Sequence, residues 1–132
     1  MLTLFLSGPA ECAVNSLTQT SVEFSDPRNI GRGSGCVPWI VEKTDPAKLV
    51  PIGAIGELVI EGPIVGRGYF NDEDKTTAAF LHAPCWLQQF GRPESRLYKT
   101  GDLVQYTFDG CVRYALLVFF FRHLKLPKVR IC

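Results

Sequence analysis

The sequence predicts an α+β fold that is mainly β, with four to six strands and one clear helix in a single unit. Short apolar runs, such as residues 36–41 and 57–61, have the length and β-branched content of strands. Glycine and proline residues separate these runs at short intervals, and the 132 residues include 12 glycines and 9 prolines. Only the segment after Asn71 carries the polar residues that begin a helix. These features are typical of a strand-rich unit with short connections.

The individual strands can be placed from turn signals and alternation. Residues 8–36 hold several glycines and prolines and are expected to form loop with at most short strands. A strand over residues 36–41 follows, and the clearest strand covers residues 57–61. In that strand we expect Leu58 and Ile60 to face one way and Val59 the other, because successive side chains of a strand point to opposite faces.

One helix is predicted between residues 71 and 84. Asn71 is the expected N-cap, and the acidic residues that follow it suit the positive end of the helix dipole. The helix should run for about ten residues and end before Pro84. Residues 84–95, around Trp86, are expected to form a surface loop, after which residues 97–103 resume an extended pattern.

The Asp109-Gly110 pair predicts a β-hairpin between residues 103–108 and 111–114. A two-residue type I′ turn would place Tyr106 opposite Arg113 and Asp102 opposite Leu117. This register matters because Asp102 is one of the candidate binding residues.

Composition excludes several classes of protein. Hydrophobic residues make up 46% of the chain and charged residues 20%, unlike a disordered chain. The net charge of +1 gives no reason to expect a nucleic-acid partner. The five cysteines include no CxxC pair, so reduced thiols in a cytoplasmic protein are expected. The apolar runs at residues 1–7 and 115–121 are too short for a signal peptide or a bilayer span, so no membrane partner is expected.

The residues alone suggest little chemistry. The glycine-rich runs match neither a dinucleotide fingerprint nor a P-loop, and His82 and His123 are isolated, so no catalytic residue is assigned. Glu11 and Asp102 are more informative because each lies in a sharp turn. A carboxylate there presents two acceptor oxygens that can hold vicinal hydroxyls or a hard cation, although most such residues are surface or capping acids.

Four motifs stand in the order and approximate spacing of a known family. They are Gly8-Pro-Ala-Glu-Cys-Ala-Val14, Gly31-Arg32, Gly56-Glu-Leu-Val-Ile-Glu-Gly62 with Val65-Gly-Arg-Gly-Tyr-Phe-Asn-Asp72, and Tyr98-Lys-Thr-Gly-Asp-Leu103. Over residues 8–114 the chain resembles the adenylation domains of fungal nonribosomal peptide synthetases, in the adenylate-forming, AMP-binding superfamily. The resemblance implies a strand-rich, distorted-barrel subdomain of a larger domain that activates a carboxylic or amino acid with ATP and transfers it to a thiolation (carrier) domain.

The resemblance also implies roles for particular residues. Glu11 matches a glutamate that helps to hold Mg²⁺ near the ATP phosphates, and Gly8 lies in the same nucleotide-binding motif. Asp102 matches an aspartate that accepts hydrogen bonds from both ribose hydroxyls, and Tyr114 matches an aromatic position near adenine. In a separate site, Val14 and Asn15 match the last two positions of the substrate side-chain pocket.

The chain departs from the family at both ends. Ser7 stands where the family has a tyrosine, and Leu117 falls at the level where the family presents an arginine to ATP. We therefore expect an unrelated leader at residues 1–7, a partial adenylation domain at 8–114 and a divergent apolar and basic tail at 115–132. The family's phosphate loop and C-terminal lysine have no counterpart in the sequence.

These departures predict a fragment that is inactive alone, and they leave open whether this chain is itself an enzyme. Two alternatives remain at this point. One is a fragment of an acyl-CoA or aryl-acid ligase, and the other is a non-catalytic β-barrel module that docks on a partner.

Overall fold

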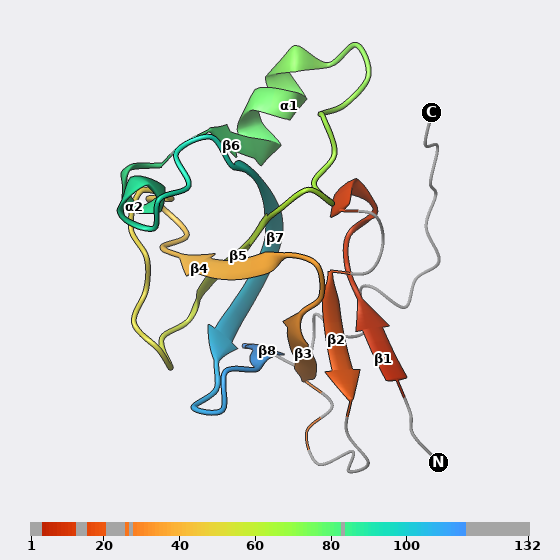
Figure 1. Ribbon diagram of the computed structural model, residues 1–132, viewed down its shortest axis with the longest axis vertical. Helices are drawn as coiled ribbons and strands as arrows, with labels where there is room; N and C mark the ends of the chain where they lie inside the picture. The colour runs from red at the N-terminus through yellow and green to blue at the C-terminus, as the bar shows by residue number, and fades with distance from the viewer. Residues whose placement is uncertain (1–3, 13–15, 21–25, 27, 83, 116–132) are drawn as a thin grey trace.

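The chain forms one antiparallel sheet with short helices around it (Figure 1). The computed structural model describes residues 4–12, 16–20, 26, 28–82 and 84–115. The elements are β1 (Leu4–Ser7), the 3-10 helix η1 (Ala10–Cys12), β2 (Leu17–Thr20), β3 (Asn29–Gly33), β4 (Val37–Val41), β5 (Gly56–Glu61), α1 (Glu73–Ala79), β6 (Phe80–His82), α2 (Cys85–Gln89), β7 (Arg96–Tyr106) and β8 (Val112–Tyr114). The predicted mainly β, α+β class with one main helix is confirmed.

The strands lie in the order β1-β2-β3-β8-β7-β5-β4, and β6 joins β7 beside this path. The eleven-residue strand β7 organises the sheet because it pairs with β5, β6 and β8. The sheet also curls. The Tyr106 hydroxyl of β7 donates to the Pro38 carbonyl of β4, although these strands are not neighbours in the sheet. This curvature agrees with the distorted barrel that the family resemblance implies.

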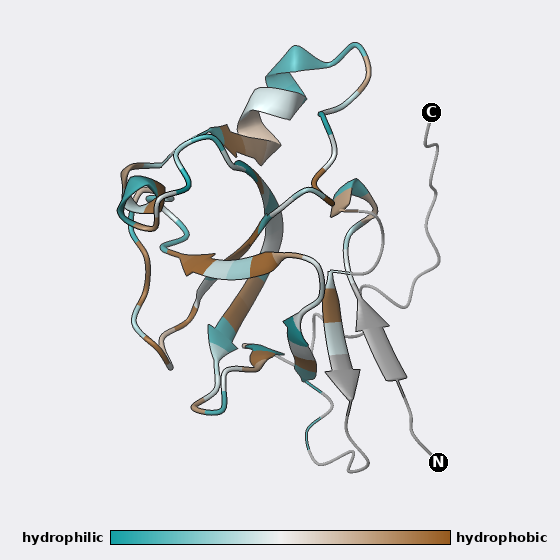
Figure 2. Cartoon of the chain, in the orientation of Figure 1, coloured by the Kyte–Doolittle hydropathy of each residue, from teal (hydrophilic) through white to brown (hydrophobic). Residues whose placement is uncertain are grey.

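Strand β5 is the centre of the core, since all of its residues are buried. Leu58 and Ile60 pack in one cluster and Val59 in the other, which confirms the predicted alternation. Figure 2 shows hydrophobic stretches along β4, β5 and β7, whereas α1 has no buried residue. The smaller cluster consists of Val41, Val59, Trp86, Leu87 and Leu97.

The predicted helix is shorter than expected and begins one residue later. Asp72, rather than Asn71, is the N-cap, and its carboxylate accepts from the backbone N–H of Lys75 at 3.0 Å. Asn71 instead has a φ of 52°, outside the range of an N-cap. The helix ends at Ala79 because Phe80 enters β6, where it pairs with Tyr98. Pairing with β7 therefore overrides the local helical pattern.

The predicted surface loop at residues 84–95 is also wrong in part, because it contains α2. Trp86 and Leu87 of this short helix are buried, with 5% and 0% of their surface exposed. The Trp86 indole donates to the Pro46 carbonyl at 3.0 Å, and its ring lies 4.9 Å from that of Trp39. Burial of these two side chains orders a segment whose local sequence predicts a loop.

The hairpin between β7 and β8 exists, but its register differs by one residue from the prediction. A type I′ turn needs a positive φ at both central residues, and only Gly110 has one, at 81°. Thr107 pairs with Cys111, so the loop comprises residues 108–110, and Tyr106 lies opposite Val112 rather than Arg113. The predicted partner of Asp102, Leu117, lies outside the described residues together with the rest of 116–132.

For residues 8–36 the sequence predicts loop with at most short strands, and their described part contains η1, β2 and β3. The backbone of β1, which falls inside the predicted leader at residues 1–7, pairs with β2. Among the described residues, no helix combines the length and the apolar character that crossing a bilayer requires.

Candidate nucleotide site

Three of the four predicted nucleotide-binding residues line one small cavity. Gly8 follows β1, Asp102 lies in β7 and Tyr114 ends β8, so the sheet brings together positions about one hundred residues apart. The cavity has a volume of about 30 Å³, enough for about two water molecules. The other lining residues are Pro9, Leu17, Ile30, Leu58 and Thr100. The predicted substrate-pocket residues Val14 and Asn15 lie outside the described residues.

A backbone irregularity places Asp102 at this cavity. Gly101 has a φ of 78°, and the pairing of β5 with β7 shifts register at this level. The Thr100 hydroxyl donates to the Leu58 carbonyl at 2.9 Å and accepts from the Asp102 N–H at 3.1 Å. Glycine suits this position because its lack of a Cβ permits a positive φ. The Thr-Gly-Asp sequence is therefore a bulge in the longest strand.

A buried carboxylate holds the bulge from the neighbouring strand. Glu57 of β5 is only 7% exposed, and its Oε1 accepts from the Gly101 N–H at 3.1 Å. Its Oε2 lies 3.6 Å from Lys99 Nζ. Sequence reasoning did not assign Glu57 to the site, although a glutamate next to a run of buried apolar residues is a signal that could have found it.

Tyr114 also lines the cavity. It is 6% exposed, pairs with Val104 of β7, and its backbone N–H donates to the Arg28 carbonyl at 2.9 Å. The lining thus combines Tyr114 and several apolar residues with the carboxylate of Asp102. This combination suits a ligand with an aromatic ring and hydroxyl groups.

Glu11 does not line the cavity, but it is three positions after Gly8 and belongs to η1. Its side-chain Oε1 accepts from the Tyr69 hydroxyl at 2.8 Å, and its backbone carbonyl accepts from the Gly66 N–H at 2.7 Å. Burial and the neighbouring carboxylate raise the pKa of Tyr69, so this phenol stays neutral and donates to Glu11. Sequence reasoning missed the role of Tyr69, because 58 positions separate the two residues.

Glu11 can supply one carboxylate ligand to a magnesium ion. Within the described part of the chain, no group of three or more His, Cys, Asp or Glu residues gathers as a metal site would. A single carboxylate suits Mg²⁺ where phosphate oxygens and water complete the coordination, as is usual for nucleotide-bound magnesium. The donor present is therefore consistent with a metal that arrives with a nucleotide.

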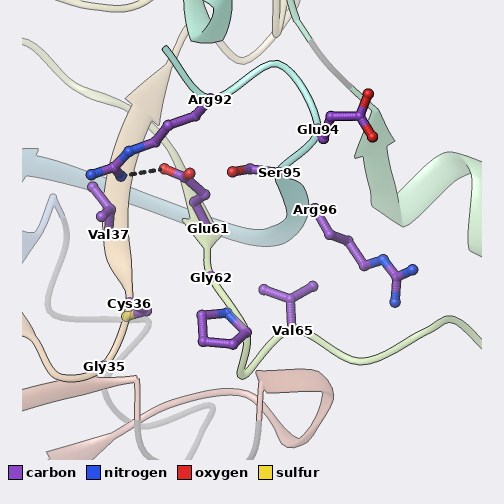
Figure 3. Close-up of a pocket in the computed structure, with 11 residues that line it drawn as sticks. Gly35, Cys36, Val37, Glu61, Gly62, Val65, Arg92, Glu94, Ser95 and Arg96 are labelled. Carbon is purple, nitrogen blue, oxygen red and sulfur yellow. Dashed lines mark hydrogen bonds and ion pairs between the residues drawn. The ribbon is translucent and has the colours of Figure 1, made fainter. Parts of the chain in front are cut away.

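A larger hollow, of about 750 Å³, lies elsewhere and contains none of the predicted site residues (Figure 3). Its walls come from residues 35–37, 61–63, 65, 92 and 94–96. Glu61 projects into it, and its Oε2 accepts from Arg92 at 3.1 Å and from the Trp39 indole at 2.7 Å. Because Glu61 is only 3% exposed, its ion pair with Arg92 and its hydrogen bond from Trp39 compensate a buried negative charge. The role of Glu61 is therefore structural.

Within the segment that aligns, about half of the residues are identical between this chain and its relatives in sequence. It is 53% identical over 108 residues to nonribosomal peptide synthetase imqB of Aspergillus flavus, 55% over 114 to otaB of Aspergillus carbonarius and 49% over 110 to D-lysergyl-peptide-synthetase subunit 1 of Epichloe festucae var. lolii. Each match covers 81% of this chain but only 3%, 6% and 3% of the relative, respectively. A search of protein-family models finds no match.

Solved structures with the same fold are larger proteins. Holo-PA1221, described as a nonribosomal peptide synthetase protein containing adenylation and PCP domains, has a TM-score of 0.72 at 23% identity, over 86% of this chain and 20% of its own. The ATP-bound RpMatB-BxBclM chimera B3 has a TM-score of 0.66 at 22% identity, over 84% of this chain and 20% of its own. At this level of identity the likeness concerns the fold alone.

The sequence relatives decide between the interpretations that the residues left open. All three are peptide synthetases, which does not favour an acyl-CoA or aryl-acid ligase fragment or a separate docking module. The folds of the solved proteins agree with the predicted adenylation architecture. The chain is therefore similar in sequence to a short segment of fungal nonribosomal peptide synthetases, and it has the fold of solved proteins that contain adenylation domains.

Proposed function

We propose that this segment forms the ribose-facing and phosphate-facing edge of an ATP site in an adenylation domain that activates a carboxylic or amino acid as its acyl-adenylate. The observation that carries the proposal is the meeting of Gly8, Asp102 and Tyr114 around one cavity. Two motifs from distant parts of the sequence and the aromatic position at Tyr114 converge there, as a shared ligand requires.

Asp102 is the proposed ribose-binding residue. A carboxylate accepts two hydrogen bonds in one plane, which matches the two vicinal hydroxyls of a ribose. The bulge that presents it is supported by Glu57 and Thr100 before any ligand arrives, so binding costs little reorganisation. Tyr114 and the apolar residues that line the cavity would pack near the adenine. Since the cavity is small, the nucleotide would lie across its opening.

Glu11 is the proposed contact to the metal of magnesium-ATP. Mg²⁺, when bound, offsets the negative charge that develops as the substrate carboxylate attacks the α-phosphate. The role of Glu11 is to bind and orient this cation through a hard oxygen. Gly8, at the start of the same loop, allows the backbone to approach the nucleotide closely.

The remaining parts of the proposal concern the whole enzyme. Val14 and Asn15 would contact the substrate side chain, and the partner would be a thiolation (carrier) domain, as holo-PA1221 contains both adenylation and PCP domains. A cytoplasmic location suits an enzyme that uses ATP and reduced thiols. The segment alone is proposed to bind ATP without turnover, because none of its assigned residues is a catalytic group. Pyrophosphate exchange by the purified chain with a panel of amino acids would contradict this.

Binding of ATP and of 2′,3′-dideoxy-ATP to the purified chain tests the ribose assignment. We expect the wild-type chain to prefer ATP and Asp102→Ala to weaken ATP binding at least about tenfold, because a charged acceptor of two hydrogen bonds is lost. The variant should also lose the preference for ATP over the dideoxy analogue. The matched control is Asp74→Ala in the exposed first turn of α1, which should bind both nucleotides as the wild type does. Equal binding of ATP by the wild type and Asp102→Ala would refute the assignment.

A further inference from the structure

The loop between β5 and α1 holds Glu11 at two points. The Tyr69 hydroxyl donates to Glu11 Oε1 at 2.8 Å, and the Gly66 N–H donates to the Glu11 carbonyl at 2.7 Å. A Cβ at Gly66 would lie 3.0 Å from that carbonyl, so this close approach favours glycine. The guanidinium of Arg96 in turn donates to the Gly66 carbonyl at 3.2 Å. The loop therefore restrains both the backbone and the side chain of the proposed metal contact.

Tyr69 is itself fixed from the side of α1. Its backbone N–H donates to the Thr76 hydroxyl at 2.8 Å. Its ring meets Phe80 edge-on with centroids 5.8 Å apart, and Lys75 Nζ lies 4.2 Å from the ring centroid. Contacts to the backbone and to the ring thus hold the phenol in place, so its hydroxyl can orient a partner rather than follow it.

A second phenol lies beside the first. Tyr98 of β7 is 6% exposed and packs on Phe80 with centroids 5.1 Å apart. A phenol is neutral at pH 7 because its ordinary pKa is about 10, so Tyr69 donates to the Glu11 carboxylate without bringing a charge. Neutral donors restrain its orientation and leave its negative charge available to a cation, whereas a lysine or arginine in the same place would compete with that cation.

We propose that Tyr69 is a positioning residue for magnesium-nucleotide binding, which acts by holding the Glu11 carboxylate in the orientation in which it meets the metal. This inference rests on the proposed role of the segment in ATP binding. Without the hydroxyl, the Glu11 side chain must lose rotamer freedom when the metal arrives, which weakens binding. Nucleotide binding without the metal does not use Glu11 and should not change.

The test is a titration of a fluorescent ATP analogue with the purified full chain, in Mg²⁺ and in EDTA. Tyr69→Phe should weaken binding about tenfold in Mg²⁺, the effect expected for one hydrogen bond to a charged group, and leave binding in EDTA unchanged. Glu11→Gln should show the same selective loss, and the double variant should lose no more than Glu11→Gln alone. The matched control is Tyr106→Phe, which removes another part-buried phenol hydroxyl, bonded to Pro38 in β4.

A second variant covers the case in which Tyr69→Phe does not fold. Thr76→Ala removes the acceptor of the Tyr69 N–H and leaves the phenol intact, so it should give a smaller loss that is again confined to Mg²⁺.

The outcomes separate the inference from the proposed function. Equal losses in Mg²⁺ and EDTA, or no loss in either, for the folded variants would overturn the positioning role while the dependence on Asp102 still supports the ribose site. No binding of the analogue by the wild-type chain, or binding that Asp102→Ala does not weaken, would overturn the proposed function and the positioning role with it. A loss confined to Mg²⁺ supports both.

Discussion

The two carboxylates assigned to the nucleotide are held in different ways. Asp102 lies on a bulge in the longest strand, and the bulge is supported by Glu57 from the fully buried strand β5. Glu11 lies in a three-residue 3-10 helix and is held by contacts from a loop. The first position depends on a buried strand of the sheet, whereas the second depends on hydrogen bonds from Tyr69 and Gly66 in a loop. Changes to the core should therefore disturb ribose binding and stability together, and changes near Glu11 should affect the metal while leaving the fold intact.

The largest expected effect is a loss of stability when a side chain is removed from the core at β5. Ile60→Ala removes a fully buried side chain from the centre of β5 and should lower the free energy of unfolding by about 3 kcal/mol. Urea denaturation measures this, with Ile52→Ala as the control because Ile52 is 68% exposed and should change stability by less than about 0.5 kcal/mol. Similar costs at the two positions would mean that β5 is not the centre of the core.

The support of the bulge should have the next largest effect. Glu57→Ala leaves the Gly101 N–H without its acceptor and should cost about 2 kcal/mol of stability. It should also weaken ATP binding, because the position of Asp102 depends on the bulge. Glu57→Gln keeps an acceptor oxygen and is the matched control, with a smaller expected cost. An unchanged ATP affinity in Glu57→Ala would separate the bulge from the ribose site.

Loss of the ion pair between Arg92 and Glu61 in the larger hollow should have a smaller effect on stability. Arg92→Ala removes the cation beside buried Glu61, but Arg92 is 47% exposed and water partly replaces it, so the expected cost is about 1 kcal/mol. ATP binding should not change, since no predicted site residue lines this hollow. Arg67→Ala, at an exposed position of the β5–α1 loop, is the control. A selective loss of ATP binding in Arg92→Ala would indicate that the nucleotide binds in the larger hollow instead.

Near Glu11 we expect a small effect on stability. Tyr69→Phe removes one hydrogen bond to a part-buried carboxylate and should lower the free energy of unfolding by only about 1 kcal/mol. Thermal unfolding measures this shift beside that of Ile60→Ala. A loss as large as that of Ile60→Ala would show that the Glu11 region is part of the core, and would remove the contrast between the two carboxylates.

The smallest expected effect is the pH dependence of stability that comes from Asp26. A hydrogen bond from the Arg28 side chain, with further help from Arg113, holds the pKa of Asp26 below its ordinary value of 3.8. A carboxyl whose pKa is lowered by folding stabilises the protein above its unfolded pKa, and this contribution is lost as pH falls through the lower folded value. Stability should therefore fall below about pH 4, and Asp26→Asn should flatten this part of the profile. An unchanged profile in Asp26→Asn would contradict this.

The features predicted correctly from sequence are those that local pattern determines. The alternation of side chains along a strand predicts that Leu58 and Ile60 face away from Val59. The glycine and proline residues between the apolar runs indicate where the strands end. The early end of the helix at Ala79 was missed because Phe80 pairs with Tyr98, a partner that no local pattern reveals. The hairpin register was missed because Asp-Gly also fits a longer loop in which only the glycine has a positive φ.

The site was predictable only in part, for a similar reason. Gly8, Glu11, Asp102 and Tyr114 came from a resemblance to family motifs, and the fold brings three of them to one cavity. Glu57 and Tyr69 act through contacts across 44 and 58 positions, which neither composition nor periodicity shows. Residues that support a site from a neighbouring strand or loop become visible only in the folded chain.

Amide NMR of the ¹⁵N-labelled chain titrated with magnesium-ATP tests the central claim most directly. The proposed function predicts shift changes at Gly8, Gly101, Asp102 and Tyr114, and little change at Arg92 and Glu94 around the larger hollow. The same changes should be absent in Asp102→Ala. Shift changes that gather at the larger hollow, or that persist in Asp102→Ala, would contradict the assignment of the cavity to the nucleotide.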